Sequence, residues 1–315
     1  MRAAAIDIGT NSVRLLVADV FRHENECKLN TLSRLMVITR LGEGVDGRGS
    51  LDREAIARTT AVLRRYREQV ESQGAERWEV VATSAAREAD NADEFVEAVK
   101  AITGREPRLI SGEEEARLTF LGATYDLGAL RPVGRAVAVV DIGGGSTEII
   151  VGANGTISRC YSLDIGCVRM SERFLASDPP RPGELEDMEN HIMSVISPHK
   201  EEISAYSAAL TVGTAGTVTT LSGIKQGLSS YVGEAIHHSW LTREEVEELY
   251  RRLREAPLER RRSLMRLEPE RADVIVGGIG VLVVLLREMG WERVLVSEKD
   301  ILDGLAITAA LEGGL

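Results

Sequence analysis

Two acidic residues flank a glycine-rich turn near the middle of the chain. Asp141 ends an apolar run rich in β-branched residues, and Glu148 opens a second such run. The turn between them contains small and hydroxyl residues, namely Gly143, Gly144, Gly145, Ser146 and Thr147. Glycine lets the backbone approach an anion closely, successive turn amides can bind phosphate oxygens, and carboxylates are ligands of Mg²⁺. We therefore predict a strand–turn–strand hairpin that binds phosphate with the turn and a divalent cation with the two acids.

Glycine-rich turns also bind phosphate in dinucleotide-binding and Walker-type sites. Both of those sites need a helix directly after the glycines. Here residues 147–151 continue as a β-branched run, and residues 153–155 (Ala-Asn-Gly) predict a hairpin turn into a further strand. The pattern therefore disfavours a dinucleotide site.

The same pattern opens the chain. Residues 3–17 align with residues 137–151 without a gap, at an offset of 134. Asp7 takes the place of Asp141, which makes it a third candidate metal ligand. Arg14 takes the place of Glu148, and we predict that it binds phosphate. The turn between them supplies three more candidate phosphate ligands, Thr10, Asn11 and Ser12.

Two more pairs of segments repeat in the same order. An apolar strand that ends in small and hydroxyl residues occurs at 79–87 and again at 210–217, where Gly213 and Thr214 are candidate phosphate ligands. A strand that leads into a helix occurs at 109–124 and again at 295–311. Three matched pairs predict an α/β fold of two related halves. Chance similarity of short apolar strands is the alternative.

The duplication also predicts domains. We expect an N-terminal domain at 1–126, a C-terminal domain with inserted helices at 127–299, and a terminal helix at 300–315 that packs back on the N-terminal domain. Equivalent hairpins in the two domains predict an interdomain cleft in which both hairpins bind one ligand. Hinge closure is common in such clefts.

One carboxylate is a candidate general base. Ser111 and Glu114 have the spacing of a helix capping box, which gives that acid a structural role. Glu115 falls on the same helical face as Leu118 and Gly122, so it should point inward. An inward carboxylate beside a phosphate site suits a base that takes a proton from water. Glu115 is therefore a candidate for the catalytic base.

Arginines offer further contacts to anions. Arg87 follows the end of a strand, where its guanidinium could bridge phosphate oxygens or stabilise transition-state charge; a surface arginine explains it equally well. Two basic clusters lie in the inserted segment: Arg251, Arg252, Arg254, Arg260, Arg261, Arg262 and Arg266. Nearby glutamates indicate a solvated helix face. The alternative is a track for a long polyanion.

Composition limits the class of protein. The 315 residues are 43% hydrophobic and 28% charged, and the net charge is −11. These values fit a folded two-domain protein and argue against binding to nucleic acid or to an anionic membrane. The longest apolar run, 274–286, is shorter than the roughly 20 residues that span a bilayer and predicts a buried helix.

Cysteines and histidines show no metal-ligand spacing. Cys27, Cys160 and Cys167 predict reduced thiols in a cytoplasmic protein, with Cys167 as a small buried residue. His237 and His238 would point to opposite sides of an extended segment.

Five motifs in order resemble the exopolyphosphatase and guanosine pentaphosphate phosphohydrolase family. They are residues 7–12 (DIGTNS), 111–116 (SGEEEA), 141–148 (DIGGGSTE), 166–169 (GCVR) and 213–216 (GTAG). The resemblance covers essentially the whole chain. It implies duplicated ribonuclease-H-like domains of the actin, hexokinase and heat-shock ATPase superfamily.

The resemblance also implies an activity. Water would remove a terminal phosphoryl group in the presence of Mg²⁺, with Glu115 as base, Arg87 as a phosphate ligand, and Asp141 and Glu148 positioning metal and water. Phosphoryl transfer of this kind depends on positioning and charge stabilisation. Inorganic polyphosphate is the expected substrate. The alternatives are a guanosine pentaphosphate 5′-phosphohydrolase and a non-catalytic sensor of polyphosphate or of guanosine penta- or tetraphosphate.

The chain departs from many relatives in two respects. It resembles the short members without an additional helical domain, and residues 298–301 (EKDI) stand where many relatives have a glycine-rich segment. Both departures leave the preferred chain length open. A homodimer is expected by base rate alone.

Overall fold

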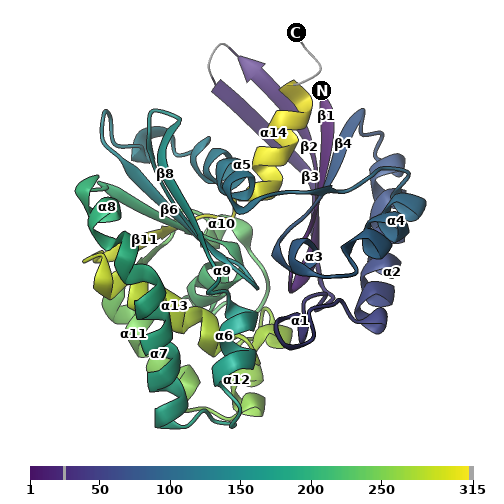
Figure 1. The fold of residues 1–315 in the computed structure, drawn as a ribbon. Helices are drawn as coiled ribbons and strands as arrows, with labels where there is room; N and C mark the ends of the chain where they lie inside the picture. Colours follow the sequence, from purple (N-terminus) through teal and green to yellow (C-terminus); the bar gives the residue numbers. More distant parts are fainter. Residues whose placement is uncertain (24–25, 312–315) are drawn as a thin grey trace. The chain divides into compact units, whose positions relative to one another are not determined.

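The computed structural model describes residues 1–23 and 26–311. The chain divides into two compact units, Met1–Gly128 together with the segment that begins at Lys299, and Ala129–Glu298. Each unit contains one β-sheet with helices packed against it (Figure 1). The two units are described separately below.

The first unit is built on a five-stranded sheet in the order β3-β2-β1-β4-β5. Its strands are β1 (Arg2–Ile8), β2 (Ser12–His23), β3 (Glu26–Ile38), β4 (Arg77–Ala82) and β5 (Arg108–Leu109). The first three strands form an antiparallel meander, and β4 and β5 continue the sheet in parallel beyond β1. Strand β1 is apolar and almost wholly buried, as expected of a central strand with both faces covered.

Helices cover both faces of this sheet (Figure 1). Helices α2 (Arg53–Ser72) and α4 (Ala92–Thr103) pack on the face that includes Ile6 and Val80. Helices α5 (Gly112–Thr124) and α14 (Ile301–Leu311) pack on the opposite face. The helix formed by the last part of the chain therefore lies in the core of the first unit.

Helices α5 and α14 cross at two glycines. A Cβ atom on Gly122 would lie 1.8 Å from the backbone oxygen of Asp300, and one on Gly304 would lie 2.0 Å from the backbone oxygen of Leu118. Both distances are far below van der Waals contact, so glycine is required at each position. The crossing holds the start of α14 against the helix that carries Glu115.

The second unit repeats this topology. Its sheet has the order β8-β7-β6-β9-β11-β10, with strands β6 (Val137–Ile142), β7 (Thr147–Ala153), β8 (Thr156–Leu163), β9 (Leu210–Thr214), β10 (Trp240–Thr242) and β11 (Arg293–Val296). The first five strands in that order match β3-β2-β1-β4-β5 in sequence order and direction. Strand β10 is an antiparallel addition. The predicted duplication of ribonuclease-H-like, actin-like halves is confirmed.

The predicted turn between β7 and β8 is also present. Asn154 and Gly155 have φ values of 52° and 80°. Two consecutive positive φ values are the signature of a type I′ turn, whose twist matches that of antiparallel strands.

Helix α13 (Ile275–Glu288) is the predicted buried helix of the second unit. Three of its glycines allow neighbouring helices to approach: a Cβ on Gly277, Gly278 or Gly280 would lie 2.4 to 2.6 Å from side-chain atoms of Ser171, Thr217 or Met188. These partners belong to α6 (Cys167–Phe174), α9 (Ala215–Lys225) and α7 (Pro182–Ile196). The glycines therefore serve helix packing.

The remaining helices are α1 (Val45–Arg48), α3 (Ser84–Glu88), α8 (Lys200–Ala205), α10 (Gly233–Ile236), α11 (Arg243–Arg254) and α12 (Leu258–Leu264). Short 3₁₀ turns occur at Gly128–Leu130, Ser197–His199 and Pro269–Arg271. Within residues 1–23 and 26–311, no helix is both long enough and apolar enough to cross a bilayer.

Candidate active site

The hairpin of β6 and β7 places two acids side by side. Asp141 and Glu148 are direct partners in the antiparallel register. Both are buried, with 5% and 1% of their surface exposed. Glu148 accepts a hydrogen bond of 2.7 Å from the hydroxyl of Ser162 on β8. Like charges directly opposite one another destabilise a sheet, so a cation bound by the two carboxylates would relieve this pair.

The glycine turn of this hairpin is held by its carbonyl groups. Backbone amides at the start of α6 donate to the three glycine oxygens: Cys167 to Gly143 at 2.9 Å, Val168 to Gly144 at 2.9 Å, and Gly166 to Gly145 at 3.0 Å. The side chain of Arg169 adds a bond from Nε to the Gly145 oxygen at 3.0 Å. The amides of Gly144 and Gly145 have no hydrogen-bond partner among the described residues. The turn is thus fixed through its acceptors, and its donors are available to an anion.

The β1–β2 hairpin has the same construction. The Gly9 amide donates to the Ser12 oxygen at 3.0 Å, as the Gly143 amide does to Ser146. The carbonyls of Thr10 and Asn11 accept from amides of the segment 39–42. Within the part of the chain that the structure describes, the amides of Thr10 and Asn11 have no such partner. Each half therefore contains one turn whose amides can bind phosphate.

The two hairpins differ in charge at one register position. Arg14 is the register partner of Asp7, as Glu148 is of Asp141. Nε and Nη2 of Arg14 donate to Oδ2 of Asp7 at 2.9 and 2.7 Å, and Nη1 donates to Asp300. Arg14 is thus paired with two carboxylates and holds Asp7. Its binding to phosphate stays a prediction.

Asp7 keeps one oxygen suited to a cation. Its Oδ1 is buried and has no hydrogen-bond partner in the described structure. Burial raises the pKa of Asp7 and outweighs the opposing effect of Arg14. A buried carboxylate oxygen without a donor is costly unless it is paired, and a hard divalent cation accepts such ligands. The predicted metal ligands Asp7, Asp141 and Glu148 therefore fit Mg²⁺ by their chemistry.

The predicted base lies on α5, beside Arg87. The side chain of Glu115 is 13% exposed, whereas that of Glu113 is 65% exposed. Nη1 of Arg87, on α3, lies 3.8 Å from Oε2 of Glu115 and donates to the Ile110 oxygen at 2.8 Å. A neighbouring cation favours the ionised form of a carboxylate, which is the form a general base needs.

The start of α5 differs in part from the prediction. Ser111 caps the helix by accepting the amide hydrogen of Glu114 at 3.2 Å. The carboxylate of Glu114 does not return to the cap: it accepts from Arg108 at 2.8 Å. Glu114 therefore pairs with Arg108 and not with the backbone amide at the helix cap.

Three predicted phosphate ligands are engaged in contacts within the fold. Two are threonines whose hydroxyls bond to backbone oxygens, and the third is a tightly packed glycine. The Thr147 hydroxyl donates to the Ile165 oxygen at 2.8 Å, and the Thr214 hydroxyl donates to the Ser297 oxygen at 3.2 Å. A Cβ on Gly213 would lie 2.8 Å from Val294. These residues hold β7, β9 and the adjoining segments together, and we no longer assign them side-chain contacts with phosphate.

Sequence reasoning missed two contributors to this region. The segment 166–169 was recognised only as a family motif, although it holds the glycine turn. Arg271 received no role, yet its buried guanidinium fills the space beside Gly216 at the start of α9, where a Cβ would lie 2.2 Å from Cζ. The packing of Gly216 against Arg271 could not be predicted from the sequence, because the two residues are far apart in the chain.

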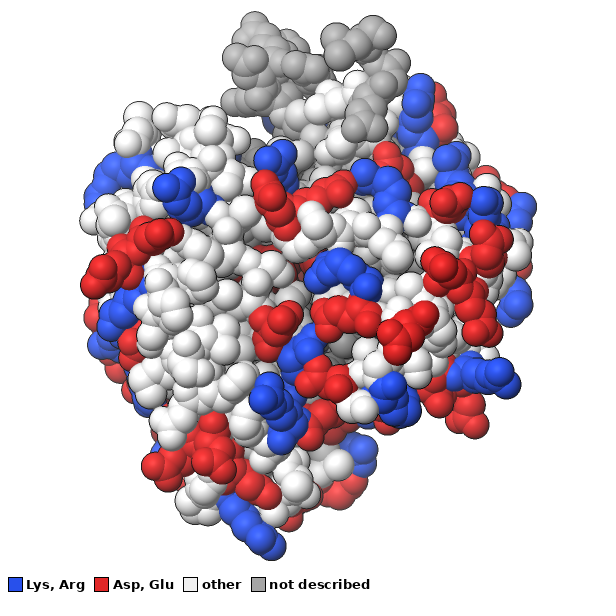
Figure 2. Space-filling model, in the orientation of Figure 1, with Lys and Arg blue, Asp and Glu red and all other residues white. Residues whose placement is uncertain are grey.

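The basic clusters of the second unit are mostly ion-paired. Arg251, Arg254, Arg261 and Arg262 contact acids, and Arg261 is buried against Asp178. Arg252, Arg260 and Arg266 have no ion pair among the described residues. On the face seen in Figure 2, basic and acidic side chains are interspersed. Surface ion pairs thus account for Arg251, Arg254 and Arg262, whereas Arg261 is a buried structural residue.

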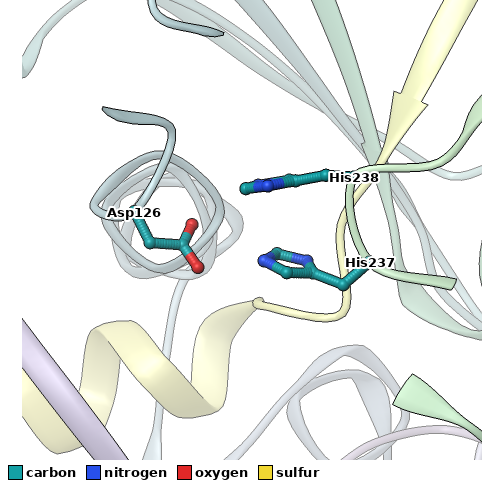
Figure 3. Close-up of side chains that lie close together, drawn as sticks. All are labelled: Asp126, His237 and His238. Atoms are coloured by element: carbon teal, nitrogen blue, oxygen red, sulfur yellow. The ribbon is translucent and has the colours of Figure 1, made fainter. Parts of the chain in front are cut away.

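The adjacent histidines are stacked, not opposed (Figure 3). The ring centroids of His237 and His238 lie 3.8 Å apart. The prediction of opposite directions assumed an extended segment, but His238 has a positive φ of 60°. Nδ1 of His237 accepts from the Glu298 amide at 3.2 Å. Asp126, also drawn in Figure 3, belongs to the first unit.

The chain is similar to known proteins over nearly its whole length. The chain is 42% identical to exopolyphosphatase 2 of Mycobacterium tuberculosis over 98% of both chains. It matches the structure of a PPX-GPPA enzyme from Aquifex aeolicus with a TM-score of 0.81 at 33% identity, over 98% of this chain and 99% of the other. It matches an exopolyphosphatase from Cytophaga hutchinsonii with a TM-score of 0.89 at 25% identity, over 99% and 98%. Residues 19–311 match the Ppx/GppA phosphatase family, and the chain belongs to that family.

Proposed function

We propose that this protein is an exopolyphosphatase that releases orthophosphate from the end of inorganic polyphosphate. The observation that carries the proposal is the repeated turn. In both halves the turn carbonyls accept hydrogen bonds from backbone amides of a neighbouring segment, and turn amides remain available to an anion. A chain of identical phosphates is a ligand that repeated amide turns suit. The similarity to a protein named exopolyphosphatase 2 supports the same substrate.

Glu115 acts as the general base in this proposal. It takes one proton from a water molecule, and the water oxygen forms a bond to the terminal phosphorus. The bond from that phosphorus to the bridging oxygen breaks, and its electron pair stays on the shortened polyphosphate. The products are orthophosphate and a chain one unit shorter, so no side-chain nucleophile is needed.

Arg87 and the turn amides stabilise charge in the same step. Arg87 presents donors beside Glu115, where the planar guanidinium can bind phosphoryl oxygens. The amides of Thr10, Asn11, Gly144 and Gly145 would bind phosphate oxygens directly, and the Ser12 and Ser146 positions complete the two turns. Donors that are already fixed in place stabilise developing charge with little reorganisation.

The proposed ligands of the divalent cation are Asp7 in the first unit and Asp141 and Glu148 in the second. Mg²⁺ would neutralise phosphoryl charge, as in other phosphoryl-transfer enzymes. The proposal predicts that chelators abolish phosphate release and that added Mg²⁺ restores it.

Phosphate release from polyphosphates of defined length tests the proposal. The wild type should release orthophosphate, and Glu115→Gln should lower kcat by about 10²- to 10⁴-fold, the usual contribution of a general base. Glu113→Gln, two residues away and exposed, is the matched control and should retain wild-type kcat.

Guanosine pentaphosphate in the same assay tests the competing substrate. If the wild type released the 5′ phosphate of this nucleotide faster than it released orthophosphate from polyphosphate, the nucleotide would be the preferred substrate. A wild type that binds polyphosphate but releases no phosphate from either compound would identify a sensor. Sedimentation of the same preparation tests the predicted homodimer.

A further inference from the structure

Asp300 joins α14 to the first hairpin and to the helix of the proposed base. Its side chain contacts Arg14 on β2, and Arg14 contacts Asp7 on β1. Its backbone oxygen lies at the α5–α14 crossing, against Gly122. One residue of the last helix thus contacts both elements that carry predicted chemistry in this unit.

The surroundings of Asp300 are strongly charged and buried. Arg14 and Arg34 contact Asp300, while Arg34 and Lys299 contact Asp303. Burial alone would raise the pKa of Asp300, but Arg14 and Arg34 outweigh it and hold that pKa below its ordinary value. Asp300 is therefore ionised at neutral pH and offsets the charge of Arg14.

The orientation of Arg14 decides which Asp7 oxygen remains available. Arg14 gives two donors to Oδ2 of Asp7 and one to Asp300, so Oδ1 of Asp7 is left without a donor. Without the charge of Asp300, the charge of Arg14 would be less well offset. A positive charge beside Asp7 opposes a cation at Oδ1.

We propose that Asp300 is a positioning residue: through Arg14 it keeps Oδ1 of Asp7 available as a ligand for the divalent cation. This inference rests on the proposed function, because it assumes that Asp7 is a metal ligand. Residues that orient metal ligands commonly contribute 10- to 100-fold to metal affinity.

Asp300→Asn separates the charge of this residue from its structural role. Asp300 also caps α14, since its Oδ1 accepts the Leu302 amide at 2.9 Å. Asparagine caps helices as well as aspartate does, so the variant can keep the cap while it loses both the charge that faces Arg14 and the oxygen that accepts from its guanidinium. Asp52→Asn, at the cap of α2 in the same unit, is the matched control because Asp52 accepts from backbone amides in the same way.

Mn²⁺ binding, followed by electron paramagnetic resonance on the whole chain without substrate, gives a readout other than activity. The inference predicts that Asp300→Asn weakens Mn²⁺ affinity at least about tenfold and that Asp52→Asn changes it less than twofold. Circular dichroism should show the same helix content in all three proteins. An unchanged affinity in Asp300→Asn overturns the inference and leaves the proposed function intact.

A double-mutant cycle tests the route through Arg14. If Asp300 acts through Arg14, Asp300→Asn should change Mn²⁺ affinity much less in an Arg14→Gln background than in the wild type. Equal effects in the two backgrounds would show that Asp300 acts by another route and would overturn the inference. A wild type that binds no Mn²⁺ would overturn both the inference and the metal role in the proposed function.

Discussion

The two hairpins share a backbone construction but differ in charge at one register position. Arg14 forms an ion pair with its register partner Asp7, whereas Glu148 places a second acid opposite Asp141. The two hairpins therefore differ in charge. Duplicated halves can diverge at one residue in this way because the backbone of both turns is already fixed by hydrogen bonds.

Cys167 lies close to the proposed phosphate-binding turn, but its role is to fill space in the core. It lies at the start of α6, beside the glycine turn, and is buried. Burial raises the pKa of its thiol to about 11. The thiolate, which is the reactive form, is therefore scarce at neutral pH.

Thiol labelling checks this assignment. In the native protein at pH 8, iodoacetamide should modify Cys27 and Cys160, which are partly exposed, much faster than Cys167. All three should react at similar rates in denaturant. Because the folded-state pKa of Cys167 lies above its ordinary value, its contribution to stability is complete at neutral pH and falls as pH rises through about 11. Equal native labelling of all three would contradict a buried thiol.

At the scale of elements, the start of α6 fixes the glycine turn by close backbone contact. A Cβ on Gly166 would lie 2.2 Å from the Gly144 oxygen and 2.5 Å from the carbonyl carbon of Gly145. Backbone atoms cannot move aside as a flexible side chain can. Any other residue at 166 must displace the turn or the helix.

Gly166→Ala should therefore lower activity by displacing the phosphate turn. We expect phosphate release to fall at least about 100-fold, because small misplacements at a reacting centre have effects of this size, and overpacking should cost about 1–3 kcal/mol of stability. Gly183→Ala in α7 is the control, since nothing lies within 4 Å of its Cβ position. Steady-state kinetics and thermal unfolding of both variants provide the comparison, and wild-type activity in Gly166→Ala would argue against the clamp.

The elements that sequence could predict are those set by local spacing. The two hairpins, their duplication and the inward face of Glu115 all follow from residues within a few positions of one another. The partner of Arg14 could not be predicted, because Asp300 lies 286 residues away. The same holds for Gly122 and Gly304, which look like ordinary helix glycines until α5 and α14 are seen to cross.

At the scale of the whole molecule, the basic clusters bear on substrate length. Most of these arginines are engaged by acids, which leaves Arg252, Arg260 and Arg266 as exposed cations without ion pairs in the described structure. Arg252 and Arg266 line a concavity of about 200 Å³ between α9, α11 and α12. A polyanion long enough to reach this concavity would contact both cations.

The double variant Arg252→Glu/Arg266→Glu tests this reduced track. If long chains contact these cations, KM for polyphosphates of several hundred units should rise at low salt, and KM for short chains should stay the same. Arg251→Glu is the control, because Arg251 is already paired with Glu248. An equal change in KM for long and short chains would contradict the track and favour the interpretation as a solvated helix face.

The position of α14 has a consequence for the nascent chain. The first unit receives this helix, although the whole of the second unit is translated before it. At ordinary translation rates the wait is on the order of ten seconds. During that time the sheet face around Ala3, Ala5 and Leu16 lacks its final cover, so the amino-terminal part of this protein emerges first from the ribosome and finishes folding last.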